Sequence, residues 1–254
     1  MTRRVDVLGC HITAGTFDDA VARVLARVRA GGGGYVCFVN GHLAVTGRED
    51  PAVLAALNGS WMSLPDGRPV YATGRLQRVS PLEPVPGPDF MRAMLRHAGE
   101  PALRHYFLGG QPEVLARLVE VVHARCPSAV VVGSCSPPFR PLATAEREAL
   151  VSKIRAARPD LVWVGLGAPK QELFMSGHWE ALQPAVLLGV GAAFDFIAGS
   201  VSRAPAWMRR LGLEWLYRLC REPRRLWRRY AYTNTMFVAY LLRDLLARRD
   251  RPDC

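Results

Sequence analysis

Residues 159–174 read PDLVWVGLGAPKQELF. The apolar run Asp160 to Val164 is typical of a strand, and Lys170 to Phe174 opens a helical pattern. Gly165 and Gly167, which stand between them, allow a sharp turn. A strand, a glycine turn and a helix in this order leave backbone N–H groups beside the strand's carboxyl end, together with the positive end of the helix. This arrangement suits a phosphate group, although an ordinary βα turn gives the same pattern.

Two further predicted strands end in glycine. Residues 187–196 read LLGVGAAFDF, with Gly191 at the turn, and residues 106–110 read YFLGG, with Gly109 and Gly110 at the end. Ligands of open parallel sheets collect outside the carboxyl ends of the strands. The second half of the chain therefore predicts a nucleotide-binding half-sheet, with these glycines near the nucleotide.

Strand-like and helical patterns alternate along the chain, which predicts right-handed βαβ units. We expect an α/β fold with a Rossmann-like, mainly parallel sheet and flanking helices. The predicted strands are residues 5–12, 35–39, 60–64, 106–108, 129–132, 161–164 and 186–190. The predicted helices are residues 17–29, 42–57 with a break near Asp50 and Pro51, 68–76, 90–97, 112–125, 143–157, 169–182, 207–219 and 224–249. Residues 77–88 hold four prolines and predict a flexible, irregular loop near the site.

The formal charge of +11 is concentrated near the end of the chain. From Arg203 onward there are 13 arginines and five acidic residues, a net charge of +8. A basic segment on a nearly neutral body indicates a polyanionic partner: nucleic acid, an anionic membrane face or a pyrophosphate. We expect a core over residues 1–202 and an Arg-rich, helical, membrane-associating appendage over residues 203–254.

Arginines recur in this segment at spacings of three, four and three, and so share one face of a helical path. They are Arg218, Arg221, Arg225 and Arg228. Trp227 and Tyr230 lie among them. A solvated arginine face is common, but the interleaved aromatic residues favour an anion-binding or membrane-surface helix.

Cysteine usage and hydropathy predict a cytoplasmic protein. Six cysteines without a CxxC pair argue against a zinc site or a disulfide framework. The sequence begins without an apolar signal segment. The apolar run at residues 231–242 is shorter than the roughly 20 residues that span a bilayer. We expect a protein that touches the membrane without crossing it.

Asn40 and Asp66 each follow a predicted strand in the first half of the chain. At the carboxyl ends of neighbouring strands, these polar side chains can face the same cleft as the glycine turns. A carboxylate there can act as a general base, although Asp66 in PDG also fits a plain turn. His42 fits a helix-start or core histidine better than a catalytic one.

Three motifs are absent from the sequence. It contains no GxSxG, no GxxxxGK[ST] and no DxD pair of the kind that holds a metal ion in many nucleotide-sugar transferases. If the enzyme handles a nucleoside diphosphate, arginines and helix N-termini must neutralise the leaving group. We therefore expect no metal site and no cofactor.

Seven motifs in order resemble the bacterial WecG/TagA/CpsF glycosyltransferases over nearly the whole chain. They are Asn40 with its following helix, LPDG at 64–67, PGPDF at 86–90, FLGG at 107–110, GLGAPKQE at 165–172, GVGAAFDFIAG at 189–199 and RAPAWMRRLGLEWLYRL at 203–219. The resemblance implies transfer of a hexose or N-acetylhexosamine from a UDP-sugar to a polyprenyl-diphosphate-linked sugar. It further implies inversion at the anomeric carbon, independence of metal, and a site completed by the appendage at the inner membrane face.

The resemblance also implies roles for individual residues. Asp66 matches the family's catalytic base, and Gln171 matches a polar cleft residue near the donor. Asn40 is a further expected site residue. The appendage arginines that close over the diphosphate match Arg218, Arg225 and Arg228. Apart from the resemblance, the position of Asp195 after the GVG strand predicts a contact with a ribose hydroxyl, and we expect Arg203 to bind the donor together with the glycine turns.

Two positions depart from the family pattern. Many members have Thr where this chain has Phe38, and Arg where it has Pro84. The contacts those side chains make in relatives stay open here.

Two other functional classes also stay open. One is a nicotinamide-dependent oxidoreductase, although this sequence lacks the acidic residue that binds the ribose in such enzymes. The other is a nucleic-acid-binding module. The sequence does not fix the sugar, the acceptor, the linkage or the oligomeric state.

Overall fold

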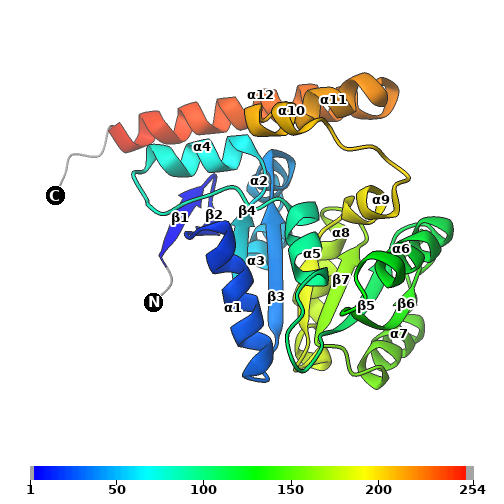
Figure 1. Cartoon of the computed structure of the whole chain (residues 1–254). Coiled ribbons are helices and arrows are strands. Elements are labelled where there is room, and N and C mark those ends of the chain that lie inside the picture. The colour runs from blue at the N-terminus through cyan, green and yellow to red at the C-terminus, as the bar shows by residue number, and fades with distance from the viewer. Residues whose placement is uncertain (1–2, 250–254) are drawn as a thin grey trace.

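The computed structural model describes residues 3–249 and contains a six-stranded parallel sheet (Figure 1). Its strands are β3 (Gly34–Val39), β4 (Met62–Pro65), β5 (Arg104–Gly109), β6 (Val130–Cys135), β7 (Leu161–Gly165) and β8 (Val186–Gly189). Across the sheet they run in the order β4-β3-β8-β7-β5-β6. The predicted α/β, Rossmann-like fold with a mainly parallel sheet is confirmed.

Helices cover both faces of the sheet (Figure 1). They are α1 (Phe17–Arg29), α2 (Gly41–Glu49), α3 (Pro51–Asn58), α4 (Arg68–Leu76), α5 (Gly87–Leu95), α6 (Pro112–Arg125), α7 (Thr144–Ala156), α8 (Lys170–His178), the 3₁₀ helix η1 (Glu180–Leu182) and α9 (Ala193–Ala198). Three more complete the chain: α10 (Ala206–Leu211), α11 (Glu214–Arg221) and α12 (Pro223–Arg249).

The central strands are apolar on both faces, because helices cover both. All six residues of β3 are buried. Val162 and Val164 of β7 belong to one apolar cluster, while Leu161 and Trp163 between them belong to the other. The alternation of side chains along each strand thus divides the core into two layers, one on each side of the sheet.

The predicted first strand over residues 5–12 is wrong in one respect. The segment forms an antiparallel hairpin of β1 (Arg4–Val7) and β2 (Cys10–Thr13) outside the main sheet. Leu8 and Gly9 both have positive φ, at 55° and 90°, and form its two-residue turn. Such turns suit the twist of antiparallel strands, and a continuous apolar pattern does not reveal them.

The irregular segment after α4 is present as predicted and is anchored to the body of the protein. Leu82 forms a bridge with Gly15, and the backbone N–H of Glu83 donates to the Gly15 carbonyl at 3.0 Å. Leu82 and Val85 are buried, at 3% and 1% exposure. Their burial fixes the path of the chain into α5.

The predicted single helix over residues 207–219 is divided into α10 and α11. Gly212 lies between them in the left-handed conformation, with φ of 76°. A Cβ atom at this position would lie 2.1 Å from Cγ of Arg68. Only glycine permits this turn and the close approach to α4.

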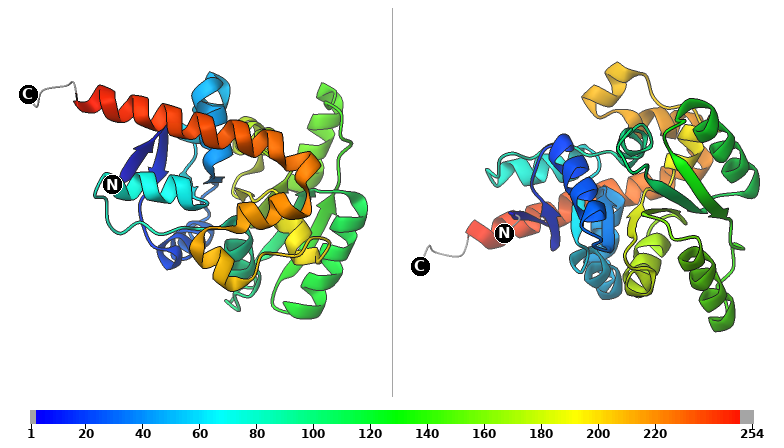
Figure 2. Two further views of the ribbon diagram at one scale, coloured as in Figure 1. Left: turned by 90° about the horizontal axis from the view of Figure 1, so that it is seen from above. Right: turned by 60° about the horizontal axis from the view of Figure 1, so that its bottom comes forward.

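The C-terminal helices lie across the carboxyl ends of the strands (Figures 1 and 2). The 27-residue helix α12 packs along α2 and buries Leu226, Thr233 and Phe237. On the α2 side, the Glu49 carboxylate accepts hydrogen bonds from the hydroxyls of Tyr232 and Tyr240, at 2.6 and 3.0 Å. No helix within residues 3–249 combines the length and apolar content needed to cross a membrane.

Candidate active site

Asn40 and Asp66 lie side by side where β3 and β4 end. Val39 and Pro65 are paired in the sheet register, and each of the two polar residues follows one of them. The backbone N–H of Asp66 donates to the Val39 carbonyl at 2.9 Å, which extends the pairing by one residue. The Asn40 side-chain oxygen accepts from the backbone N–H of Leu43 at 3.0 Å and caps α2. The structure therefore brings both predicted residues to one end of the sheet.

The pKa of Asp66 is raised well above that of an ordinary aspartate. Burial raises its pKa from 3.8 to about 7, and the negative charges of Glu214 and Asp89 add to this rise. The guanidinium groups of Arg203 and Arg218 oppose it. A carboxylate with such a pKa can both take and release a proton under physiological conditions.

Arg203 joins the core to the C-terminal helices. Its guanidinium pairs with Asp89 of α5 at 2.5 Å and with Glu214 of α11 at 3.2 Å, and only 8% of its side chain is exposed. Arg209 of α10 reaches the same Asp89 carboxylate at 3.6 Å. These ion pairs fix α10 and α11 above Asp66.

Arg218 and Arg203 both lie over the ring of Phe196. Both guanidinium groups lie 5.6 Å from the ring centre of Phe196. Nε of Arg218 is buried and has no hydrogen-bond partner among residues 3–249. A stacked cation with an unused buried donor is prepared to receive an anion.

The arginines predicted to share one face are divided between two helices. Arg218 and Arg221 belong to α11, whereas Arg228 belongs to α12, which begins at Pro223. Arg228 is exposed and stacks over the neighbouring Trp227 at 5.5 Å. The side chain of Arg225 lies outside the described residues.

Gln171 is buried against the end of β8. Its amide nitrogen donates to the Gly189 carbonyl at 2.9 Å and to the carboxylate of Glu172 at 2.8 Å. Its oxygen has no partner among the described residues. Gly191 turns away from β8 directly beside this oxygen.

The glycine turns of β5 and β7 meet at the same end of the sheet. Gly109 and Gly165 are paired in register, and a Cβ on Gly109 would lie 2.6 Å from the Gly165 carbonyl oxygen. Gly110 continues this turn against Phe194, whereas a Cβ on Gly167 would meet no atom within 4 Å. The structure therefore brings these turns together and leaves open space at Gly167.

Two features near this end bear on a nucleotide. Asp195 lies in the first turn of α9, the helix that follows the Gly191 turn. Helix α8 begins after the Gly167 turn without a side-chain cap, and of its first N–H groups that of Gln171 donates to the Gly167 carbonyl at 3.0 Å. Free N–H groups at a helix start are suited to a phosphate.

The comparison with known families agrees with this geometry. Residues 5–251 match the sequence model of the glycosyl transferase WecG/TagA/CpsF family. The chain belongs to this family. It is therefore a glycosyltransferase of cell-surface polysaccharide biosynthesis, and the resemblance inferred from the sequence is confirmed.

Four residues at the site of this WecG/TagA/CpsF member were not predicted from its sequence. Asp89 and Glu214 form the ion pairs with Arg203, Phe196 contacts both Arg203 and Arg218, and Glu172 accepts a hydrogen bond from Gln171. Each lies inside a motif that carried the resemblance, and this was the available signal. Spacing alone could not identify them, because their contacts depend on how the chain folds; Asp89, for example, is 114 residues from Arg203.

Phe38, which departs from the family pattern, belongs to the core. Its ring lies 5.3 Å from that of Phe90, and its side chain is 4% exposed. It packs against the start of α5, where Asp89 lies. Pro84 lies in the anchored segment before α5.

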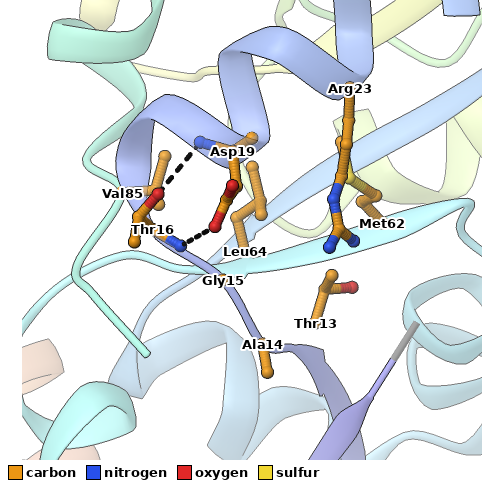
Figure 3. A pocket seen from close by; sticks show the side chains of 10 residues that line it. Thr13, Ala14, Gly15, Thr16, Asp19, Arg23, Met62, Leu64 and Val85 are labelled. Atoms are coloured by element: carbon orange, nitrogen blue, oxygen red, sulfur yellow. Dashed lines mark hydrogen bonds between the residues drawn. The ribbon is translucent and has the colours of Figure 1, made fainter. Parts of the chain in front are cut away.

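A separate small cavity lies at the start of α1 (Figure 3). Thr16 and Asp19 form a reciprocal capping box beside it, with hydrogen bonds of 2.9 and 3.0 Å. Its volume of about 10 Å³ holds a single water molecule and no sugar nucleotide. Among residues 3–249, no group of three or more His, Cys, Asp or Glu side chains is placed to hold a metal ion.

Proposed function

We propose that this glycosyltransferase moves a hexose or N-acetylhexosamine from a UDP-sugar to a polyprenyl-diphosphate-linked sugar, with inversion and without a metal ion. The observation that carries the proposal is the placement of Asp66. It lies at a strand end beneath the C-terminal helices, with its pKa near 7 and two arginines close enough to affect it. A proton acceptor and cations thus converge on one place.

The proposed reaction is a direct displacement. Asp66 takes the proton of the acceptor hydroxyl, whose oxygen forms a bond to the anomeric carbon. The bond from that carbon to the donor diphosphate breaks on the opposite face, and its electron pair leaves with UDP. One displacement of this kind inverts the anomeric centre.

Positive groups of the chain are proposed to stabilise the departing diphosphate. Arg218 offers a buried donor without a partner, and the uncapped start of α8 offers backbone N–H groups. Groups that are already oriented toward developing charge need little rearrangement during the reaction. In this proposal, Arg218 and the N–H groups at the start of α8 stabilise the negative charge that a divalent cation stabilises in other transferases. Arg225 and Arg228 are further candidates for this role.

The C-terminal helices are proposed to rest on the inner face of the cell membrane. Large apolar side chains are unusually exposed on α10 and α11: Trp207 at 60%, Leu211 at 64%, Trp215 at 40% and Leu216 at 37%. Trp227 and Leu242 of α12 are exposed at 53% and 55%, and arginines lie among them. Exposed Trp and Leu beside arginine suit the interface of an anionic bilayer. A lipid-linked acceptor would then reach Asp66 directly from the membrane.

A panel of UDP-sugars tests the proposal, with a synthetic lipid-diphosphate-linked sugar as acceptor and UDP release as the signal. We expect one or a few sugars to be transferred, in the presence of EDTA, with inversion of the anomeric centre. Activity that is lost in EDTA and restored by manganese would overturn the metal-free mechanism. Absence of transfer from every UDP-sugar would overturn the donor assignment.

A further inference from the structure

Glu172 is a buried acid for which the proposed reaction has no use. Its side chain is fully buried, at 0% exposure, on the face of α8 that packs against the sheet. One of its carboxyl oxygens accepts the hydrogen bond from Gln171, and the other has no partner among the described residues. Burying a carboxyl group is unfavourable, so a buried one calls for an explanation from its contacts.

The contacts with Glu172 and Gly189 together determine which way the Gln171 amide faces. The amide nitrogen lies 2.8 Å from a Glu172 carboxyl oxygen and 2.9 Å from the Gly189 carbonyl oxygen. Both neighbours accept hydrogen bonds, and the nitrogen has two protons to donate. In the reversed orientation the amide oxygen would face the Gly189 carbonyl without a proton between them. Glu172 and Gly189 together therefore exclude the reversed amide.

This orientation leaves the amide oxygen as the group that Gln171 can offer. The oxygen is buried without a partner among residues 3–249. It lies 3.5 Å from the position that a Cβ would occupy on Gly191, so a side chain there would cover it. An acceptor in this state is satisfied by a ligand that brings a hydroxyl or N–H donor.

The strand order indicates which part of the ligand lies there. The end of β8, with Gln171 beside it, stands between the end of β3 and the end of β7. Asn40 and Asp66 lie on the β3 side, and the glycine turns at Gly165 and Gly109 lie on the other. In the proposed reaction the acceptor binds at Asp66 and the nucleotide at the glycine turns. The transferred sugar must then lie between them, beside Gln171.

We propose that Glu172 is a positioning residue that fixes the Gln171 amide, so that its oxygen accepts a hydrogen bond from a hydroxyl group of the transferred sugar. The sugar contact rests on the proposed function, whereas the fixed amide does not. Glu172 acts through Gln171 and does not itself touch the sugar.

Hydrogen exchange in the full-length protein without ligand tests the fixed amide. The side-chain NH₂ signals of Gln171 are assigned by their absence from the spectrum of Gln171→Met. We expect both protons to exchange at least about tenfold more slowly than those of an exposed glutamine such as Gln111. Fast exchange of both protons would overturn the proposal, without any need for a variant of Glu172 to fold.

Paired variants of Glu172 test the consequence for sugar transfer. Glu172→Gln keeps an oxygen that accepts from Gln171, and should keep kcat/KM within about threefold of the unchanged enzyme. Glu172→Met has a similar length and no acceptor, and should lose about tenfold or more in kcat/KM. Binding of UDP alone should change less than about twofold in both variants, because UDP lacks the sugar.

The outcomes separate the positioning role from a structural one. If Glu172→Met lowers UDP binding and the melting temperature along with kcat/KM, or if it leaves kcat/KM unchanged, Glu172 does not act as proposed. Rescue by Glu172→Gln with unchanged UDP binding supports the role. If no UDP-sugar is transferred at all, the proposed function fails, while protected Gln171 protons would still establish the fixed amide.

Discussion

At the scale of the residue, the raised pKa of Asp66 comes from its surroundings and not from the turn sequence in which it lies. The PDG sequence itself predicts only a turn. The raised pKa comes from burial under the C-terminal helices and from the charges of Glu214 and Asp89. Arg203 and Arg218 limit the rise, so that the pKa stays at about 7.

Replacing Asp66 with Asn should lower kcat/KM by about 10²-fold or more, because the amide is nearly isosteric but cannot take a proton. With Asp66 present, kcat/KM should increase as the pH rises through about 7 and then level off, since only the ionised carboxylate is a base. Initial rates measured between about pH 5.5 and 9 should show this limb in the unchanged enzyme and not in the variant. Glu120→Gln, on the exposed face of α6, is the matched control and should keep full activity. Undiminished turnover by a folded Asp66→Asn protein would remove Asp66 as the base.

Replacing Arg218 with Met should lower kcat by about 10²-fold, because one preoriented donor to the departing diphosphate is lost. Arg218→Lys should recover part of this loss, since it restores the charge without the planar contact with Phe196. Steady-state rates with saturating donor and acceptor give the comparison. Arg117→Met, an exposed arginine of α6, should have little effect. Equal rates for Arg218→Met and Arg117→Met would contradict the role of Arg218.

At the scale of the element, the break at Gly212 lets α10 and α11 turn their charged side chains toward the core and their large apolar side chains outward. Because α10 and α11 turn there, Arg209, Glu214 and Arg218 face the core while Trp207 and Leu211 face outward. One straight helix over the same residues would not give this division of faces. The two short helices thus present an ionic inner side and an apolar outer side.

The triple substitution Trp207→Ser, Leu211→Ser, Trp215→Ser should weaken binding to anionic lipid vesicles by at least about tenfold, because membrane binding scales with the apolar area that is buried. Cosedimentation with vesicles measures the bound fraction. The circular dichroism spectrum should not change, since these side chains are already exposed. Leu173→Ser, an exposed apolar residue of α8 in the core, should bind vesicles normally. Equal partitioning of the triple variant and the unchanged protein would refute the membrane surface.

At the scale of the whole molecule, the end of the chain is built into the fold near its beginning. Helix α12 packs on α2, the helix that Asn40 caps. The ion pair of Arg48 with Asp244, at 3.0 Å, lies on the same contact. Deleting the C-terminal segment would therefore also uncover apolar core, so point substitutions are the better test of its role.

Phe237→Ala should lower the free energy of unfolding by about 3 kcal/mol, because it leaves a cavity between α12 and α2. For a domain of this size that corresponds to a decrease in melting temperature of about 6 °C or more. The neighbouring Val238 is 54% exposed, and Val238→Ala should change the melting temperature by no more than about 2 °C. Calorimetry on the full-length proteins makes the comparison. Equal melting temperatures for the two variants would show that α12 is not part of the cooperative unit.

The candidate site was predictable as far as it depends on position along the strands. The places of Asn40, Asp66 and the glycines follow from where apolar runs end, because parallel strands bring their carboxyl ends to one edge. Asp89 and Glu214 were not predictable, since their relation to Arg203 depends on how α5 and α11 meet in space. The N-terminal hairpin and the division at Gly212 were also missed, because an apolar pattern does not record a turn of one or two residues.

The sequence by itself determined the family, the parallel α/β sheet and the edge of the sheet at which the candidate site lies. These features rest on apolar periodicity and glycine positions, which are local properties of the chain. Only the tertiary structure decided which charges surround Asp66, which way the Gln171 amide faces, and which side of α10 and α11 is left exposed. The physical reason is that burial, electrostatic interaction and hydrogen-bond pairing depend on the folded neighbourhood. The C-terminal helices bring the charges to Asp66, and the packing of α8 on β8 brings the Gln171 amide to the Gly189 carbonyl.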